Sequence, residues 1–251
     1  MSNANGQSIV ILGATSSVAR ALAHEFARRG SPLIFAARDT DDAAVIAVDT
    51  EVRFGVPTQV VRFDADRMEN LPRTLERCLE VADGDIGGVV LCYGYMDEQK
   101  KAQADPDIAE RTMNINLTSA VIVLEQFAAY FADRKAGFIA ALSSVAGDRG
   151  RQSNYLYGAS KAGLTAYLQG LRNRMAPCGV PVTTIKPGFM DTKMTFGLPG
   201  LFLVASPEQA GQAIHYAIVR KKDVVYVPWF WRYIMLIIRH VPEKIFKRMK
   251  M

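Results

Sequence analysis

The chain has 251 residues and a formal net charge of +5; 49% of its residues are apolar and 22% are charged. This composition excludes a disordered protein and provides a sizeable core for one large α/β domain or two small ones. The cysteines, Cys78, Cys92 and Cys178, are scattered and the three histidines lack metal-ligand spacing, so we predict neither a disulfide framework nor a metal site. Residues 1–7 contain no apolar signal segment, which favours a cytoplasmic protein.

The chain opens with a pattern typical of dinucleotide binding. Ser8 to Leu12 reads as a buried strand, Gly13 begins a turn, and Val18 to Arg29 reads as a helix. In such a unit the free amides at the helix N-terminus bind a pyrophosphate. We therefore expect cofactor contacts from the residues of this turn, namely Gly13, Thr15, Ser16, Ser17 and Val18.

The second expected strand, Leu33 to Ala37, ends beside a residue that bears on the choice of cofactor. An acid at the end of this strand commonly binds the ribose 2′-hydroxyl of NAD, but Ala37 stands there and Arg38 follows. A guanidinium can hold the 2′-phosphate of NADP in a bidentate manner. We favour NADPH for this reason. The alternative is that Arg38 is a solvated loop charge and that Asp39 binds the ribose of NAD.

Two more strands and a long helical stretch follow. Thr58 to Phe63 reads as a strand with Asp64 at its end, and Gly87 to Cys92 reads as another that leads into Tyr93 and Gly94. Pro106 to Asp133 reads as one or two helices. It contains Asn116, a poor helix former in mid-helix, which suggests a specific role.

The central motif of the chain combines a serine, a tyrosine and a lysine. Tyr157 and Lys161 are four residues apart in a stretch that reads as helical to about Met175, so their side chains share one helix face. A cation beside a phenol lowers its pKa by roughly 1–3 units, which would suit Tyr157 to proton transfer. Ser144 follows the apolar strand Gly137 to Leu142 and can bind the same substrate oxygen.

The last third of the chain supplies the remaining strands. Val182 to Lys186 reads as the sixth strand, followed by a Pro187-Gly188 turn, and Val224 to Val227 reads as the seventh. Between them, Ser206 and Pro207 mark the start of a helix that runs to about Arg220. The apolar segment 193–205 is expected to cover the substrate; core packing is the alternative.

This combination of motifs resembles the short-chain dehydrogenase/reductase family over nearly the whole chain. The resemblance implies a Rossmann-like, doubly wound parallel sheet of seven strands, an NADP-binding domain over residues 1–228, and carbonyl reduction. It implies that Tyr157 protonates the substrate oxygen, that Lys161 lowers the pKa of Tyr157 and holds the ribose, and that Ser144 binds the oxygen. The same resemblance implies a homodimer or homotetramer.

The resemblance also assigns roles to residues whose chemistry alone is ambiguous. It places Asp64 beside the adenine, although Asp64 could instead cap the helix expected over 67–82, and it gives Asn116 a water in the proton path. Cofactor contacts are implied for Tyr93, Gly94, Pro187, Gly188, Met190 and Thr192. The chain departs from the family pattern T-G-x3-G-x-G, with Leu12, Ser17 and Ala19 at three positions, and from N-N-A-G, of which only Gly94 remains.

The last 23 residues, 229–251, carry the entire charge excess of the chain. They hold six lysines and arginines against one glutamate, together with both tryptophans and the apolar run Tyr233 to Ile238, which is far too short to span a bilayer. Aromatic, apolar and cationic side chains together favour an amphipathic appendage that binds an anionic membrane surface. The alternative is contact with a neighbouring subunit. Because the seven strands end at Val227, we expect the protein to stay folded when it is truncated near Trp231.

The turn G-A-T-S-S-V-A and the tail further resemble the decaprenylphosphoryl-2-keto-ribose reductases of cell-wall biosynthesis. This resemblance implies a keto-sugar substrate on a polyprenyl phosphate, at the inner face of the plasma membrane. The alternatives are a reductase of long-chain keto-lipids, of 3-ketoacyl type, and a non-catalytic membrane-bound scaffold. We expect no nucleic-acid partner.

Overall fold

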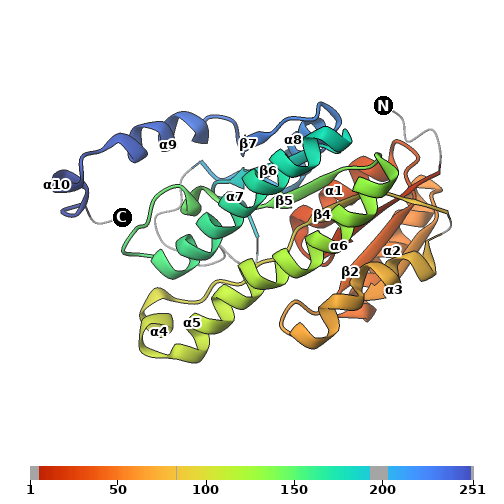
Figure 1. Cartoon of the computed structure of the whole chain (residues 1–251), viewed down its shortest axis with the longest axis horizontal. Coiled ribbons are helices and arrows are strands. Elements are labelled where there is room, and N and C mark those ends of the chain that lie inside the picture. The colour runs from red at the N-terminus through yellow and green to blue at the C-terminus, as the bar shows by residue number, and fades with distance from the viewer. Residues whose placement is uncertain (1–5, 83, 193–202, 250–251) are drawn as a thin grey trace.

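The fold is built around one parallel sheet of seven strands (Figure 1). The computed structural model describes residues 6–82, 84–192 and 203–249. The strands, in the spatial order β3-β2-β1-β4-β5-β6-β7, are β1 (Ser8–Leu12), β2 (Leu33–Ala37), β3 (Thr58–Arg62), β4 (Ile86–Leu91), β5 (Ile139–Leu142), β6 (Val182–Pro187) and β7 (Val224–Val227). Strand order reverses between β1 and β4, which is where such sheets bind ligands. The predicted doubly wound fold is therefore confirmed.

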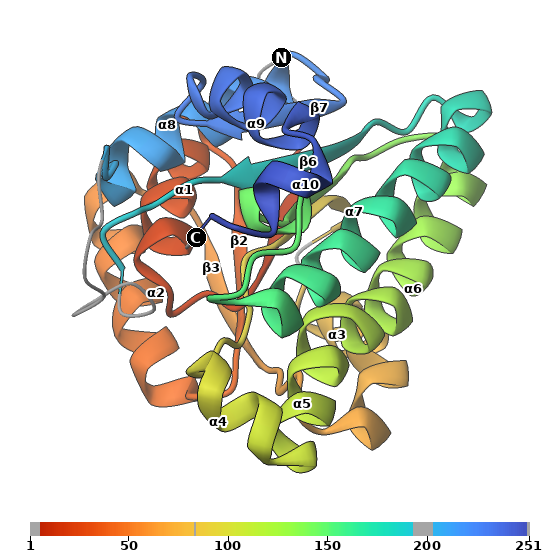
Figure 2. The ribbon, with the colours of Figure 1, turned by 90° about the vertical axis from the view of Figure 1, so that its left-hand side faces the viewer.

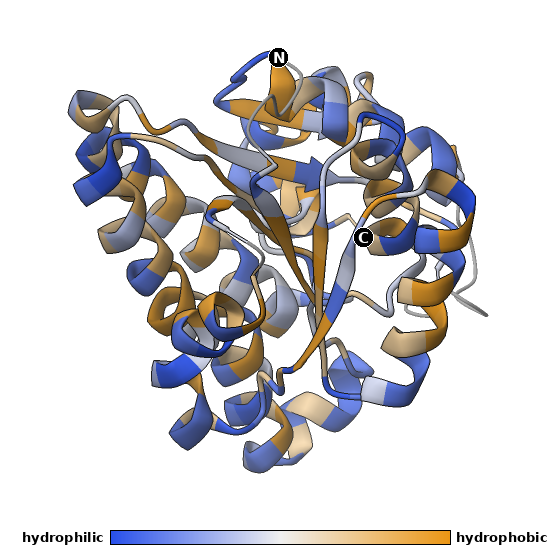
Figure 3. Cartoon of the chain, turned by 90° about the vertical axis from the view of Figure 1, so that its right-hand side faces the viewer, coloured by the Kyte–Doolittle hydropathy of each residue, from blue (hydrophilic) through white to orange (hydrophobic). Residues whose placement is uncertain are grey.

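Helices cover both faces of the sheet, as Figure 2 shows. One face is covered by α1 (Ser17–Ala27), α2 (Thr40–Phe54) and α8 (Pro207–Val219), and the other by α3 (Thr74–Val81), α6 (Ser119–Arg134) and α7 (Tyr155–Met175). The central strands are apolar on both faces, and much of the sheet is coloured orange in Figure 3. This pattern explains why the strands are readable from the sequence.

Helix α2 was not among the predicted elements, and its surface explains why. Its inner face buries only small residues, Ala43, Ala47 and Thr50. Val45, Val48 and Val52 are 71%, 61% and 80% exposed, so apolar residues occur on both faces of the helix. An amphipathic stripe, the usual sequence signal of a surface helix, is therefore absent from α2.

The predicted long helix around Asn116 consists of three segments. It comprises α5 (Pro106–Met113), one π-helical turn, η2 (Asn114–Thr118), and α6. Such turns interrupt α-helices at functional sites. The whole stretch is long and apolar enough to cross a membrane, but half of its apolar window is buried inside the protein, as in the core helix of a soluble protein.

The C-terminal segment forms two helices, α9 (Trp231–His240) and α10 (Glu243–Phe246), which lie along one end of the molecule (Figure 1). Trp231 is 1% exposed and Met235 is 0% exposed, and both pack with Val145 in a third core cluster. A truncation near Trp231 would remove part of this core. The expectation that the truncated protein stays folded remains a prediction, and the burial of Trp231 and Met235 implies that the truncation lowers its stability.

Candidate active site

The predicted site residues gather at the carboxyl edge of the sheet, where three glycines allow close backbone approaches. Gly13 follows β1 with a φ of +80°, and a Cβ there would lie 2.6 Å from the Cβ of Tyr93. A Cβ on Gly94, after β4, would lie 3.3 Å from Nζ of Lys161. A Cβ on Gly188, after β6, would overlap the indole of Trp231. No larger residue fits at positions 13 and 188 without a shift of the surrounding structure.

The start of α1 has the chemistry that a pyrophosphate requires. Ser16 caps the helix: its Oγ accepts a 3.1 Å hydrogen bond from the amide of Ala19, and its carbonyl accepts one of 2.9 Å from Arg20. Within the described part of the chain, no hydrogen bond is found for the amides of Ser17 and Val18. Thr15 and Ser17 are exposed. Two free amides at a helix N-terminus fit a dinucleotide diphosphate.

The loop that carries Ser144 is pressed against the start of α7. Ser144 precedes a single 3-10 turn, η3 (Val145–Gly147), and its Oγ accepts a 3.0 Å hydrogen bond from the amide of Ala146. A Cβ on Gly147 would lie 2.7 Å from the backbone of Lys161, and one on Gly158 would lie 2.9 Å from the carbonyl of Ala146. These close approaches bring Ser144 to the helix that carries Tyr157 and Lys161.

Tyr157 and Lys161 share one face of α7, as predicted. The Nζ of Lys161 lies 5.8 Å from the centroid of the Tyr157 ring and donates a 3.0 Å hydrogen bond to the carbonyl of Leu142. Burial raises the pKa of Tyr157 to about 12, against a lowering influence from its hydrogen bond with Ser144. Burial also lowers the pKa of Lys161 to about 8.

The predicted lowering of the Tyr157 pKa by Lys161 is therefore wrong for this structure. The prediction counted the attraction between a cation and a phenolate but not the cost of removing both charges from water. In the folded protein, desolvation is the larger effect on each side chain. Tyr157 and Lys161 do share one helix face, but the pKa of Tyr157 is shifted in the direction opposite to the predicted one.

Asn116 fixes the loop after β4 through its side-chain amide. Its Oδ1 accepts a 2.7 Å hydrogen bond from the amide of Tyr95, and its Nδ2 donates to the carbonyl of Tyr95 at 2.7 Å and to Oγ of Ser160 at 3.0 Å. Asn116 is buried inside the π-helical turn. It thus links the loop at Gly94 to α7, one residue from Lys161. The side chain of its neighbour Asn114 instead donates a hydrogen bond to Glu110 on the surface.

At the end of β2, Arg38 and Asp39 have different environments. Asp39 is the N-cap of α2, and its Oδ1 accepts hydrogen bonds from the amides of Asp41 and Asp42 at 3.2 and 3.0 Å. Arg38 is exposed, and among the described residues it has no hydrogen bond or ion pair. The guanidinium of Arg38 is therefore available to a ligand, whereas one oxygen of Asp39 is occupied by the helix.

Asp64 and Tyr93 lie near the carboxyl edge of the sheet, and the side chains of both make hydrogen bonds within the protein. The Oδ1 of Asp64 accepts a 3.1 Å hydrogen bond from Asp66, so Asp64 does organise the turn that follows β3. The hydroxyl of Tyr93 lies 2.8 Å from Oγ of Ser119, and its ring packs on Phe63 at 5.2 Å between centroids. The structure places both residues at the carboxyl ends of their strands, as expected.

The turn after β6 contains the remaining predicted contacts. The amide of Gly188 donates a 2.9 Å hydrogen bond to the carbonyl of Val227, and Met190 pairs with Ala205 across an isolated bridge. Pro187 ends β6, and Thr192 is the last described residue before the gap. The predicted substrate cover over 193–205 lies mostly outside the described residues.

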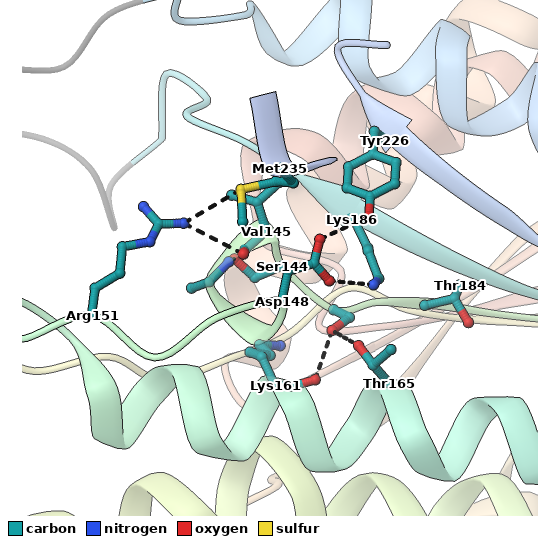
Figure 4. Close-up of polar contacts among 12 residues, drawn as sticks. Ser144, Val145, Asp148, Arg151, Lys161, Thr165, Thr184, Lys186, Tyr226 and Met235 are labelled. Carbon is teal, nitrogen blue, oxygen red and sulfur yellow. Dashed lines mark hydrogen bonds and ion pairs between the residues drawn. The ribbon is translucent and has the colours of Figure 1, made fainter. Parts of the chain in front are cut away.

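Sequence reasoning missed a buried polar network beside Ser144, drawn in Figure 4. Asp148, Lys186 and Tyr226 form it, and Arg151 lies nearby with a 3.4 Å hydrogen bond to the carbonyl of Val145. Its one visible signal is Lys186, a charged residue within the otherwise uncharged strand Val182–Pro187.

Comparison with known proteins identifies the family. The family model for short chain dehydrogenases matches residues 7–198. The chain belongs to the short-chain dehydrogenase family. Uncharacterized oxidoreductases of Mycobacterium tuberculosis and Streptomyces coelicolor are each 31% identical to it, covering 99% and 97% of this chain and 99% and 96% of their own.

Solved structures agree with this assignment. A bulky-bulky ketone specific alcohol dehydrogenase from Comamonas testosteroni is 25% identical, with a TM-score of 0.79 over 94% of this chain and 95% of its own. A short-chain dehydrogenase from Sphingobium yanoikuyae, solved in complex with NADPH, shares the fold at 23% identity, with a TM-score of 0.77 over 94% of this chain and 97% of its own. As a member of this family, the protein is an NAD(P)-dependent oxidoreductase.

Proposed function

We propose that this short-chain dehydrogenase is an NADPH-dependent carbonyl reductase whose substrate is a keto-sugar on a polyprenyl phosphate. The observation that carries the proposal is the position of the basic, apolar C-terminal segment, which is held directly against the loop of Ser144. The catalytic loop thus contacts a surface of the kind that binds membranes. This arrangement suits a substrate that has a polar reacting group and a long apolar carrier.

The chemistry follows from the four residues at the carboxyl edge of the sheet. When bound, the nicotinamide cofactor supplies the hydride that adds to the carbonyl carbon of the substrate. Ser144 donates a hydrogen bond to the carbonyl oxygen, and Tyr157 gives that oxygen its proton. Lys161 lies on the next turn of α7, where it can bind the ribose and assist proton transfer, and Asn116 holds the loop beside it.

The preference for NADPH over NADH rests on Arg38. Its side chain is exposed beside the carboxyl end of β2, where the adenine ribose is bound in this type of sheet. The 2′-phosphate of NADP is the group that a free guanidinium binds well. Asp39, the residue that would favour NAD, already caps α2.

The membrane proposal rests on the outer surface of α9 and α10. Trp229, Tyr233 and Ile237 are 72%, 58% and 69% exposed, and Leu236, Ile245 and Met249 are also exposed. The chain interleaves them with five exposed cations, Arg232, Arg239, Lys244, Lys247 and Arg248. Apolar side chains among cations fit an anionic membrane surface at the inner face of the plasma membrane.

Arg149 anchors this segment to the catalytic loop. Its guanidinium donates hydrogen bonds to the carbonyls of Ile238, Arg239 and Val241 at 2.6, 3.2 and 2.6 Å, at the carboxyl end of α9. It pairs with Glu243 at 2.9 Å and lies 3.7 Å from the ring centroid of Phe246. The side chain is only 14% exposed, so a single residue five positions after Ser144 binds both tail helices.

Two alternatives involve the same surfaces. A long-chain keto-lipid, of 3-ketoacyl type, would use the same membrane surface and the same catalytic residues. A neighbouring subunit could also cover the tail; we propose a homodimer or homotetramer, with the exposed Tyr216, Val219 and Val224 beside the edge strand β7 as a second candidate contact.

The experiment is a turnover assay with NADPH over a panel of lipid-linked keto-sugars, long-chain keto-lipids and water-soluble ketones, with and without anionic vesicles. We expect the polyprenyl-linked keto-sugar to give the highest kcat/KM, and vesicles to raise it further. A higher kcat/KM for the keto-lipids would replace the proposed substrate with the alternative. Light scattering of the protein without vesicles measures its molar mass and would detect an oligomer, the state that a subunit contact at the tail requires.

A further inference from the structure

A buried ion pair lies next to the catalytic loop. Lys186 and Asp148 form it with side chains that are 7% and 2% exposed, and the hydroxyl of Tyr226 donates a 2.7 Å hydrogen bond to the second carboxylate oxygen of Asp148 (Figure 4). Both oxygens of this buried carboxylate therefore have a partner, as a buried charge requires.

The three residues come from three elements that meet at the proposed active site. Asp148 ends the 3-10 turn that Ser144 begins, and its amide donates a 3.2 Å hydrogen bond to the carbonyl of Val145. Lys186 lies on β6 and directly precedes Pro187 and Gly188. Tyr226 is the partner of Lys186 in the register of β6 and β7, so the two side chains lie side by side. The ion pair thus links the Ser144 loop to the turn after β6.

A stabilising role alone explains this arrangement poorly. Buried ion pairs cost so much desolvation that well-packed apolar residues of similar size often stabilise a protein as well or better. The two hydrogen-bonded oxygens of Asp148 instead fix the position of the loop, because the carboxylate has to face Lys186 and Tyr226 at the same time. The other strong contacts of the loop, those of Arg149, bind the C-terminal helices, and Arg151 makes only long contacts, to the carbonyl of Val145 at 3.4 Å and to Sδ of Met235 at 3.8 Å.

We propose that Asp148, Lys186 and Tyr226 are positioning residues, which fix the hydroxyl of Ser144 relative to the Pro187–Gly188 turn. The inference rests on the proposed function in one respect, that Ser144 binds the substrate oxygen while the turn faces the nicotinamide. A misplacement of about 1 Å between such groups can reduce turnover by roughly a hundredfold. The proposed cofactor contacts at the start of α1 and at Arg38 lie on other elements, so we expect cofactor binding to change little.

The test compares two single substitutions, one on β7 and one on β6, that each remove a hydroxyl group engaged in a hydrogen bond. Tyr226→Phe removes the hydrogen bond to Asp148 and leaves the ion pair in place. The control, Thr184→Val, lies on β6 two residues before Lys186. Oγ1 of Thr184 accepts a 2.7 Å hydrogen bond from Arg172, a contact that involves neither the Ser144 loop nor the ion pair. A double variant, Lys186→Gln with Asp148→Asn, replaces the charges by neutral groups of similar shape.

The assay uses the full chain, a water-soluble aromatic ketone or its alcohol, whichever the unmodified enzyme converts, and NADPH or NADP. Failure of the keto-sugar proposal therefore leaves this test intact. We expect Tyr226→Phe to lower kcat about tenfold, and the double variant more, at a nearly unchanged KM for the cofactor. Thr184→Val should lower the melting temperature without changing kcat.

Equal kcat values for Tyr226→Phe and the unmodified enzyme would overturn the proposal. An equally large loss of kcat in Thr184→Val and in Tyr226→Phe would also overturn it, because the loss would then follow from reduced stability and not from the position of Ser144. If the double variant does not fold, the comparison between Tyr226→Phe and Thr184→Val still tests the proposal. Both single variants should fold, because Tyr226→Phe removes one oxygen and Thr184→Val replaces one hydroxyl by a methyl group.

Discussion

The Nζ of Lys161 donates its hydrogen bond to the carbonyl of Leu142, at 3.0 Å, from a position that is almost entirely withdrawn from water. A neutral carbonyl only partly replaces the hydration of an ammonium group, so burial lowers the pKa of Lys161 to about 8. Lys161, which we propose assists Tyr157, therefore loses its charge at a much lower pH than an exposed lysine does.

This relationship predicts a pH dependence of stability. The lysine has an ordinary pKa of 10.5, so between pH 8 and 10.5 the unfolded chain binds more protons than the folded one, and stability rises with pH across that window. The full effect is about 3 kcal/mol. Above pH 10 the raised pKa of Tyr157 acts in the opposite direction, because the folded state then holds the extra proton.

Urea unfolding of the unmodified protein and of Lys161→Met at pH 8, 9 and 10 measures this effect. We expect the free energy of unfolding of Lys161→Met to change less with pH over this range than that of the unmodified protein. Parallel pH profiles for the two proteins would show that Lys161 is not desolvated as described.

Cofactor preference should change with Arg38. The guanidinium is exposed and without a partner among the described residues, so Arg38→Ala should weaken NADPH binding by about tenfold while NADH binding stays nearly constant. Fluorescence titration with both cofactors measures the change. Asp39→Ser is the matched control, because serine keeps the cap on α2 and removes the acid. If Asp39→Ser weakens NADH binding and Arg38→Ala changes nothing, the NAD alternative is correct.

The C-terminal segment 229–251 should have two faces with different roles, one packed in the core and one that binds the membrane. Trp231 is 1% exposed, so Trp231→Ala should destabilise the protein by about 3–5 kcal/mol. Ile237 is 69% exposed, so Ile237→Ser should leave stability within about 0.5 kcal/mol and weaken binding to anionic vesicles. Vesicle flotation at low and high salt, with thermal unfolding as the control, measures both. Undiminished flotation of Ile237→Ser would favour a subunit contact at this face.

Most of the sheet was predictable because its strands are buried on both faces and read as continuous apolar runs. β1, β2 and β7 have the predicted bounds, and α8 begins at Pro207 with Ser206 as its cap, as predicted. The sequence pattern failed at α2, where exposed valines obscure the helical periodicity. It also did not predict the packing of α9. In the sequence, Trp231 and Met235 belong to the apolar face of an amphipathic helix, and only the structure shows that they pack with Val145 in the core.

The candidate site was predictable in its residues but not in its electrostatics. The spacing of Tyr157 and Lys161 requires only helix geometry, and α7 supplies it. Their pKa values depend on how much water the surrounding loops exclude, and no local pattern encodes that quantity. The ion pair of Asp148 and Lys186 joins residues 38 positions apart, so it emerges only when η3 and β6 are brought together.

Replacing Tyr157 by phenylalanine tests the central claim most directly, because it removes one hydroxyl from a residue whose ring is otherwise retained. Turnover of a ketone and binding of NADPH should be measured on the same preparation of Tyr157→Phe and of the unmodified enzyme. We predict that kcat falls by a factor of at least about 100, while the dissociation constant for NADPH changes by less than about threefold. A kcat close to that of the unmodified enzyme would contradict the assignment of Tyr157 as the proton donor.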